Sequence, residues 1–339
     1  MLKNEIHYFL STVGSRGYRS FEDECFGSLV KSKRLFGYPA ALVQQVVDRI
    51  KREAAKREFS CQVIHNFLDG KAEGIIIEET KAGIINTPLY FLKREHFAAV
   101  LEDEHIERTK KALDEAVSCF REAKKIHDKW EKIYVLNMDF GAADSLADEV
   151  SRKVINGKKG SGEGAIYDRF LGAATAEGPR DMIESITEKV GKRYFIKGRP
   201  GTGKSTFLRK IIRAAQENGF DVERYHCAFD PGSVDMAVIR EMGVCFFDST
   251  APHEHFPMRS GDEIIDIYDA AITPGTDEKY EKELLTISGA YKLKMLEAQK
   301  ALFKARSAYE KTEAFYMAKT NHAELEMLTE ECLALLFDK

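Results

Sequence analysis

The amino-acid sequence predicts an α/β fold in which a three-layer unit occurs twice in tandem, each copy with a long helical, coiled-coil-like arm. Three observations support this prediction. Short apolar segments typical of strands alternate with an amphipathic helical segment in the second half of the chain. A glycine-rich segment separates two halves that share matching residues. Each half also contains a heptad pattern of apolar residues.

The second half shows the order of elements most clearly. Residues 193–197 are expected to form a short buried strand. Apolar residues recur at helical spacing over 204–218, and Gly219 supplies a stop signal. Residues 222–226 and 243–248 have the apolar character of two further strands. Strand, helix, strand and strand in this order favour an α/β domain.

The segment 156–164 contains only glycine and polar residues, which is the composition of a linker. We therefore expect a first half at 1–155, a linker at 156–165 and a second half at 166–339. Each half is long enough to form a domain of ordinary size.

The two halves share residues at two constant offsets, which indicates a diverged tandem duplication. A chance similarity of helical composition is the alternative. The second offset is larger than the first, so the second half carries extra residues between the two blocks. The matches pair Phe9 with Phe170, Gly37 with Gly198, Pro39 with Pro200, His65 with His226 and Asp69 with Asp230, and then Ala123 with Ala305, Lys129 with Lys311, Glu131 with Glu313 and Tyr134 with Tyr316.

Alternating spacings of four and three residues predict a long helix in each arm. Two such helices in one chain would bury their apolar seams most simply against each other. The seam of the first arm is Leu113, Ala116, Phe120, Ala123, His127, Trp130 and Tyr134, and that of the second is Tyr291, Met295, Ala298, Leu302, Ala305, Tyr309, Thr312 and Tyr316.

Composition excludes several classes of protein. The chain is 44% hydrophobic and carries a formal charge of −4, so it can build a core and lacks the basic excess typical of nucleic-acid binders. The six cysteines are scattered, with no C-x-x-C pair, as is typical of reduced thiols. We find no signal peptide and no apolar run long enough to cross a bilayer. We therefore expect a soluble, cytoplasmic protein that does not bind membranes.

The segment 198–205 matches the phosphate-binding pattern G-x-x-x-x-G-K-[ST]. Glycines let successive backbone N–H groups point at phosphate oxygens, and the following helix adds its N-terminal dipole. Lys204 would bridge the β- and γ-phosphates, and Ser205 would give its hydroxyl to Mg²⁺. A glycine turn that only caps a helix is the alternative. The expected nucleotide-binding residues are Gly198, Arg199, Pro200, Gly201, Thr202, Gly203, Lys204, Ser205 and Thr206.

With this motif and two later segments, the second half resembles the P-loop NTPase superfamily over about residues 165–260. The whole chain resembles a bacterial family of tandem P-loop ATPase-like proteins. In that family each half pairs a P-loop with a later His-Cys segment and an Asp-[Ser/Gly]-Thr-Ala-Pro-His segment. The second half keeps all three, at 198–205, 226–227 and 248–253. The resemblance implies a P-loop NTPase fold and nucleotide binding, and it indicates no particular substrate.

Asp248 ends an apolar strand, which is the form of a Walker B aspartate that lies near Mg²⁺. We therefore expect Lys204 and Asp248 to be catalytic, and Ser205 and Asp248 to hold Mg²⁺. The residue after Asp248 is Ser249 rather than an acidic residue that could activate water. This difference predicts slow hydrolysis.

The first half lacks the corresponding residues. Leu42 would crowd a phosphate, and Val43 stands at the position of the lysine that would supply a positive charge. We therefore expect this half to bind no nucleoside triphosphate. An unrelated helical domain that has been misaligned is the alternative. The alignment places Leu42, Val43 and Gln44 at the positions of Gly203, Lys204 and Ser205, and Asn86 at the position of Asp248.

Several other polar residues follow the second-half strands. The imidazole and thiol groups could form a metal site, but a role as substrate contacts or supporting residues fits them better, because loops after parallel strands form the ligand crevice. Arg199, Arg180 and Arg259 are candidate phosphate contacts or solvated surface residues. The candidate substrate residues are His226, Asp230, His253 and Arg259, and the possible metal group is His226, Cys227, His253 and His255.

The function predicted from these features is that of an ATP-binding, Mg²⁺-dependent NTPase, a slow hydrolase in which nucleotide state moves the helical arm. The absence of an N-K-x-D signature favours ATP over GTP. Two alternatives remain open. A small-molecule or nucleotide kinase-like phosphotransferase would use Arg259 and His253 as acceptor contacts. A non-enzymatic nucleotide-binding scaffold would bind a protein partner or a second copy through its heptad helices.

Overall fold

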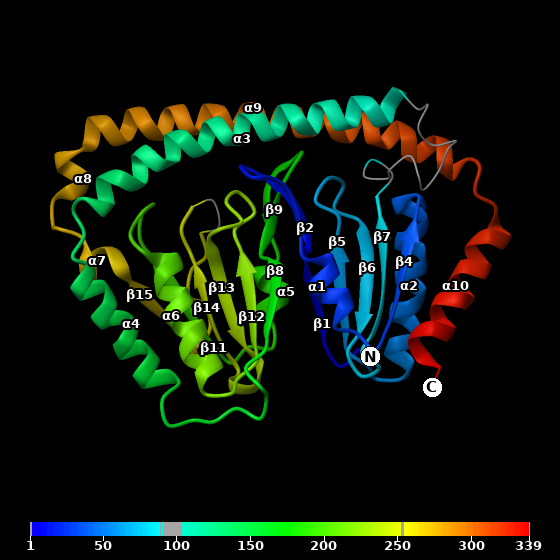
Figure 1. Ribbon diagram of the computed structural model, residues 1–339, viewed down its shortest axis with the longest axis horizontal. Helices are drawn as coiled ribbons and strands as arrows, with labels where there is room; N and C mark the ends of the chain where they lie inside the picture. The colour runs from blue at the N-terminus through cyan, green and yellow to red at the C-terminus, as the bar shows by residue number, and fades with distance from the viewer. Residues whose placement is uncertain (1, 89, 91–103, 252–253, 339) are drawn as a thin grey trace.

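The computed structural model describes residues 2–88, 90, 104–251 and 254–338. Two α/β halves lie side by side beneath a pair of long helices (Figure 1). The expected α/β class is confirmed. Within the part of the chain that the structure describes, no helix combines the length and the apolar character needed to cross a bilayer.

The first half contains a five-stranded sheet with the strand order β1-β5-β6-β7-β4 and a separate hairpin of β2 and β3. Its elements are β1 (Glu5–Tyr8), β2 (Ser11–Gly14), β3 (Gly17–Ser20), α1 (Glu22–Gly27), β4 (Lys31–Phe36), α2 (Ala40–Lys56), β5 (Cys61–His65), β6 (Ala72–Ile77), β7 (Ala82–Thr87), α3 (Glu104–Val135) and α4 (Phe140–Val154).

The second half contains a six-stranded sheet with the strand order β15-β11-β14-β13-β12-β8 and a hairpin of β9 and β10. Its elements are β8 (Ile166–Phe170), β9 (Gly172–Thr175), β10 (Gly178–Asp181), α5 (Ile183–Thr187), β11 (Lys192–Lys197), α6 (Lys204–Glu217), β12 (Val222–His226), β13 (Val234–Ile239), the 3₁₀ turn η2 (Arg240–Met242), β14 (Val244–Asp248), β15 (Asp262–Asp266), α7 (Ile267–Ala271), α8 (Thr276–Lys279), α9 (Glu281–Met317) and α10 (His322–Phe337).

The two sheets correspond strand by strand. In each sheet the first strand pairs in parallel with the strand that follows the long helix α2 or α6, and two antiparallel pairings follow. A parallel pairing of β4 with β7, or of β11 with β14, completes the order. The second sheet adds β15 beyond β11. This correspondence supports the hypothesis of a tandem duplication.

The strand and helix predicted around the glycine segment are confirmed, as are the strands predicted at 222–226 and 243–248. Helix α6 buries its apolar stripe against the sheet, and Gly219, with a φ of 79°, ends it. The buried residues of α6 are Phe207, Leu208, Ile211, Ile212 and Ala215.

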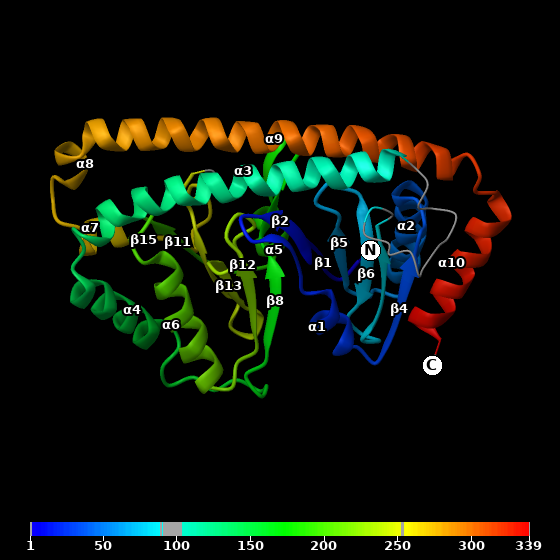
Figure 2. The ribbon, with the colours of Figure 1, turned by 45° about the horizontal axis from the view of Figure 1, so that its top comes forward.

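The long helices α3 and α9 pack against each other in antiparallel orientation above both halves (Figure 2). The ion pairs Lys304–Glu115 and Lys294–Glu122 link the two helices, with N–O distances of 2.9 and 2.8 Å. The predicted packing of the two heptad seams is therefore confirmed for these helices. Most seam residues are buried, including Ala116, Phe120, Ala123, Tyr134, Ala298, Leu302, Ala305 and Tyr309.

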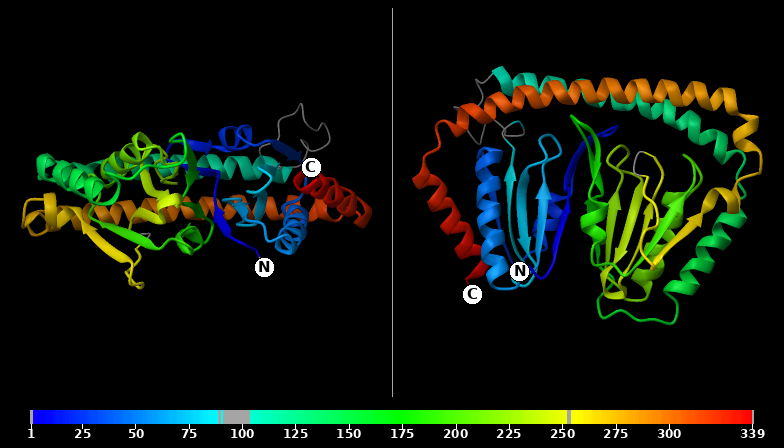
Figure 3. Two further views of the ribbon diagram at one scale, coloured as in Figure 1. Left: turned by 90° about the horizontal axis from the view of Figure 1, so that it is seen from below. Right: turned by 180° about the vertical axis from the view of Figure 1, so that it is seen from behind.

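The helices that follow the arms are exchanged between the halves. Helix α4 precedes the linker in sequence, but it packs on α6 and α7 of the second half. Helix α10 ends the second half in sequence, but it packs on α2 of the first half (Figure 3). The segment 156–165 thus separates the two halves along the chain. The two halves do not, however, pack as two independent units.

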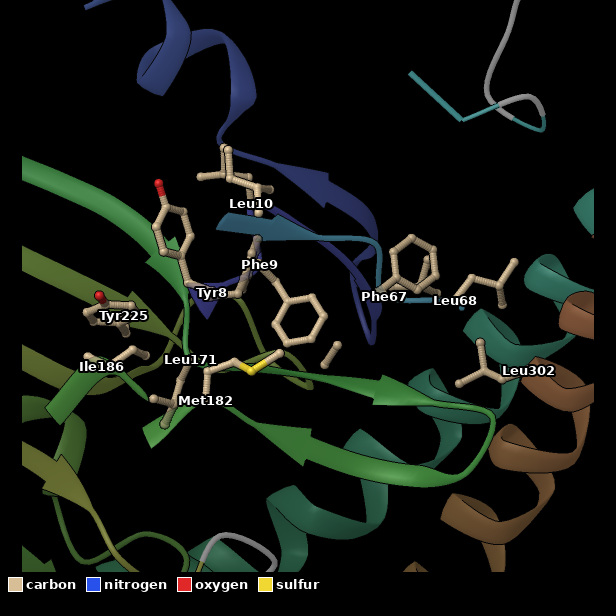
Figure 4. Close-up of a cluster of buried hydrophobic side chains, with 14 of the residues drawn as sticks. Tyr8, Phe9, Leu10, Phe67, Leu68, Leu171, Met182, Ile186, Tyr225 and Leu302 are labelled. Atoms are coloured by element: carbon tan, nitrogen blue, oxygen red, sulfur yellow. The ribbon is translucent and has the colours of Figure 1, made fainter. Parts of the chain in front are cut away.

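A continuous apolar core joins the two halves to the arms. It includes β1 and β8 residues, the short helix α5 and the middle of α3 and α9. In Figure 4, Phe9 of the first half lies near Leu171 and Met182 of the second, while Phe67 and Leu68 lie toward the arm residue Leu302. The halves also meet through backbone hydrogen bonds in both directions between Phe9 and Phe170.

Candidate functional site

The glycine loop, residues 198–203, connects the carboxyl end of β11 to the first turn of α6. Gly201 and Gly203 have φ angles of 82° and 81°, which L-residues with a side chain rarely adopt. Helix α6 begins at Lys204, so the N–H groups of its first turn have no partner within the helix and point toward the loop. The loop and the first turn of α6 therefore lie together at this edge of the sheet.

Lys204 and Asp248 lie together at this edge of the sheet. Strand β14 pairs in parallel with β11, and Asp248 is in register with Ile196 two residues before the loop. The Lys204 Nζ is 3.6 Å from Asp248 Oδ2 and donates to the carbonyl oxygen of Arg199 at 2.8 Å. The cation and carboxylate predicted from the motif therefore face each other across neighbouring parallel strands.

Other side chains of this segment hold the loop in place. The buried Thr202 hydroxyl donates to the Arg199 carbonyl at 2.9 Å and accepts from the Arg199 N–H at 3.2 Å. The Ser205 hydroxyl accepts from the backbone N–H of Val234 at 2.9 Å, which ties α6 to β13. Ser205 retains its own O–H and a further lone pair for another ligand.

The first-half loop between β4 and α2 has a different chemistry. Leu42 and Val43 belong to the first turn of α2, and their apolar side chains are buried in the core, so neither presents a polar group to the loop. Asn86 is in register with Leu35, the position in β7 that Asp248 has in β14, and its Nδ2 donates to the Tyr38 carbonyl at 3.1 Å. A hydrogen bond between neutral groups therefore holds this loop to its own sheet.

Helix α3, which belongs to the first half in sequence, covers the second-half glycine loop. A Cβ atom at Gly201 would lie 2.5 Å from the carbonyl oxygen of Glu131, and one at Gly203 would lie 2.9 Å from Met138 Cε. The Arg199 guanidinium is 3.2 Å from Asp277 Oδ2, and Tyr134 of α3 donates to the other oxygen of Asp277 at 2.8 Å. The loop is thus in direct contact with the end of the arm.

Charged side chains from the first half gather beside this loop. Lys124 Nζ of α3 is 3.8 Å from Glu131 Oε2 and 3.6 Å from Asp230 Oδ2, and Arg16 Nε is 3.1 Å from Asp230 Oδ1. His127 Nδ1 is 3.4 Å from Glu131 Oε1. Sequence reasoning placed only Asp230 among these residues at the site. In the sequence, the match of Glu131 with Glu313 was the one indication that the arm contributes to this site.

Burial changes the acid–base behaviour of this cluster. Burial and the charge of Lys124 lower the pKa of His127 to about 4, so its imidazole is neutral at pH 7. Burial raises the pKa of Glu131, and the positive charge of Lys124 opposes the shift. A neutral imidazole and a carboxylate of raised pKa are both able to accept a proton.

The remaining candidates are spread over the molecule. His226 bonds Asp168 Oδ1 at 2.7 Å and the Pro231 carbonyl at 2.9 Å, beside the interface between the halves. Arg259 donates to the Thr187 carbonyl, near the amino end of β11, so the structure does not bring it to the glycine loop. Arg180 reaches Gly70 in the first half. His253 lies outside the described residues.

The histidine and cysteine group predicted as a possible metal site is not assembled among the described residues. In the described part of the chain, His127, Asp128 and Glu131 of α3 place their ligand atoms within 4.8 Å of one another. Lys124 bonds Asp128 and so places a competing cation beside that group. The cluster is therefore better described as an ion-pair network than as a metal centre.

No protein-family model, curated protein or solved structure matches the chain.

Proposed function

We propose that the protein is an ATP-binding, Mg²⁺-dependent P-loop NTPase with its nucleotide site in the second half. One observation carries the proposal: Lys204, at the start of α6, lies 3.6 Å from Asp248, at the end of the neighbouring parallel strand, beside a loop of residues with positive φ. This is the arrangement that phosphate and Mg²⁺ require of a P-loop.

The donor set fits a triphosphate. The loop N–H groups and the first turn of α6 would hold the β-phosphate, and Lys204 would exchange the Arg199 carbonyl for phosphate oxygens. The Ser205 hydroxyl and the Asp248 carboxylate are the oxygen ligands that Mg²⁺ prefers, the latter through water. When bound, Mg²⁺ would neutralise charge on the β- and γ-phosphates.

Hydrolysis is a better account than transfer to a small acceptor. Arg259, which the phosphotransfer alternative needs at the acceptor side, lies near the opposite end of β11. Ser249 is fully buried, and its hydroxyl donates to the His255 carbonyl at 2.7 Å. It is therefore a structural residue of the loop after β14, which agrees with the slow hydrolysis predicted from its side chain.

Contacts between the glycine loop and α3 support coupling of nucleotide state to the arm. The loop contacts the Glu131 backbone and Met138, and Arg199 shares Asp277 with Tyr134. A phosphate that repositions the loop or Lys204 would act directly on the last turn of α3. Because α3 extends above the first half, such a movement would reach that half as well.

A turnover and binding assay with matched variants tests this proposal. Lys204→Ala should abolish ATP binding and Mg²⁺-dependent ADP release, because it removes the phosphate-bridging cation. Arg213→Ala, on the exposed face of the same helix, should leave both unchanged. Equal ATP affinity in the wild type and Lys204→Ala would refute the proposal.

A further inference from the structure

The arm of each half places a glutamate at the loop of the other half. Glu131 of α3 lies against Gly201 in the second-half loop, and Glu313 of α9 lies against the first-half loop. These two residues occupy matching places in the arms, and the loops occupy matching places in the sheets. The contact in the second half is made by the Glu131 backbone, whereas the contact in the first half is made by the Glu313 carboxylate.

In the first half the glutamate reaches the first turn of α2, directly after the loop. Glu313 is 4% exposed, and its Oε2 accepts from the backbone N–H of Ala41 at 3.4 Å. Ala41 corresponds to Thr202, the residue before Gly203. A carboxylate at this point of the arm can thus come within hydrogen-bond distance of the backbone amide at this position, where a terminal phosphate and its attacking water would lie in a P-loop site.

In the second half the glutamate is held next to the loop without filling it. The Glu131 side chain is 37% exposed and its carboxylate is close to Lys124 and His127. The groups that face it are Lys124, His127 and Asp128 of α3, Asp230 after β12, and Lys204 of α6.

We propose that Glu131 is the catalytic base of the second-half site, the acidic residue that is missing after Asp248 and is supplied here by the arm of the first half. This inference rests on the proposed ATPase function. It makes the first half a necessary part of the active site, since α3 is the element that carries the base.

The step balances as a hydrolysis. The Glu131 carboxylate accepts a proton from the attacking water while the oxygen of that water forms a bond to the γ-phosphorus. The bond from phosphorus to the β,γ-bridging oxygen breaks, and its electron pair stays on that oxygen. The products are ADP and inorganic phosphate, and the proton on Glu131 returns to solvent. Lys204 would balance the charge of the departing diphosphate, and Mg²⁺ held by Ser205 and Asp248 would supply further positive charge there.

Glu131→Gln tests the inference because it keeps the shape of the side chain and removes the base. We expect the turnover number for ATP to fall by ~100-fold or more. ATP affinity should stay within about threefold of the wild type, because the change acts on the transition state. Glu107→Gln, at the exposed far end of α3, is the matched control and should change neither quantity.

The chain's single tryptophan provides a binding readout that is independent of turnover. Trp130 precedes Glu131 in α3, so its fluorescence should respond to ATP in the wild type and in Glu131→Gln alike. Unchanged turnover in Glu131→Gln, or loss of ATP affinity in that variant, would overturn the inference. A wild type that binds ATP without hydrolysing it would overturn the hydrolase part of the proposed function. A wild type that binds no ATP would instead overturn the proposed function.

Discussion

Arg169 is the central cation of the interface between the halves. It is 5% exposed, lies over the Tyr8 ring at 4.3 Å and donates to Gln62 of the first half at 3.0 Å. Within its own half its Nη1 is 3.0 Å from Glu223 Oε1, and Arg240 donates to both oxygens of that carboxylate. Such a buried pair is costly to break, because the remaining charge has no water to solvate it.

Glu223→Gln should therefore destabilise the protein by about 3–5 kcal/mol. Burial alone would raise the pKa of Glu223, but Arg169 and Arg240 outweigh it and hold the pKa at about 2. A carboxyl whose folded-state pKa is lowered stabilises the fold above its unfolded value of about 4.3 and loses that contribution as the pH falls toward 2.

Urea unfolding at pH 7 and at pH 3 measures this prediction. The wild type should lose stability between these values, and Glu223→Gln should lose less over the same interval. Glu184→Gln, on α5 and outside the Arg169 network, serves as a control for the charge change. A Glu223→Gln variant as stable as the wild type at pH 7 would contradict the buried-pair account.

The part of the site that is local in sequence could be predicted from the sequence. Lys204, Ser205 and Asp248 follow from a short motif and from the strand that ends beside it. Glu131 and Arg16 could not, because they come from the other half and reach Gly201 and Asp230 only through α3 and the β2–β3 hairpin. No local pattern encodes such a contact.

At the scale of elements, the long periodic helices and the strands at 193–197, 222–226 and 243–248 were predictable, whereas β13 and β15 were not. Strand β15 (DEIID) has only two apolar residues and lies at the sheet edge, so its pairing with β11 depends on tertiary context. Strand β13 runs antiparallel between β12 and β14. The position of β13 follows from the order of strands in the sheet, and no sequence motif marks this strand.

Helix α4 shows how packing and chain order differ. It buries Ala147, Val150 and Val154 in the core that also contains α6 and α7 of the second half. Lys210 of α6 donates to Asp144 of α4 at 2.7 Å. The second sheet is therefore covered by a helix that precedes the linker.

A fragment of residues 136–339 should consequently be more stable and more soluble than one of residues 156–339. The shorter fragment lacks α4 and so exposes the parts of α6 and α7 on which α4 packs. Each buried aliphatic side chain is worth about 1.5–3 kcal/mol. Thermal unfolding and sedimentation of the two fragments measure the difference, and both lose α3 equally. Identical behaviour would show that α4 contributes nothing to the second half.

At the scale of the whole molecule, the two halves have similar frameworks but unequal sites. Both sheets share one strand order, and both loops are covered by the arm of the other half. Only the second loop has a lysine facing a carboxylate, while the first has buried Val43 and is contacted by Glu313. The central claim is therefore that one half binds nucleotide and the other half supports it.

The stoichiometry of ATP binding tests this claim most directly. Isothermal titration of the full chain with Mg²⁺ and a non-hydrolysable ATP analogue should give one site per chain, and Lys204→Ala should give none. Two sites per chain, or one site that survives in Lys204→Ala, would contradict the account.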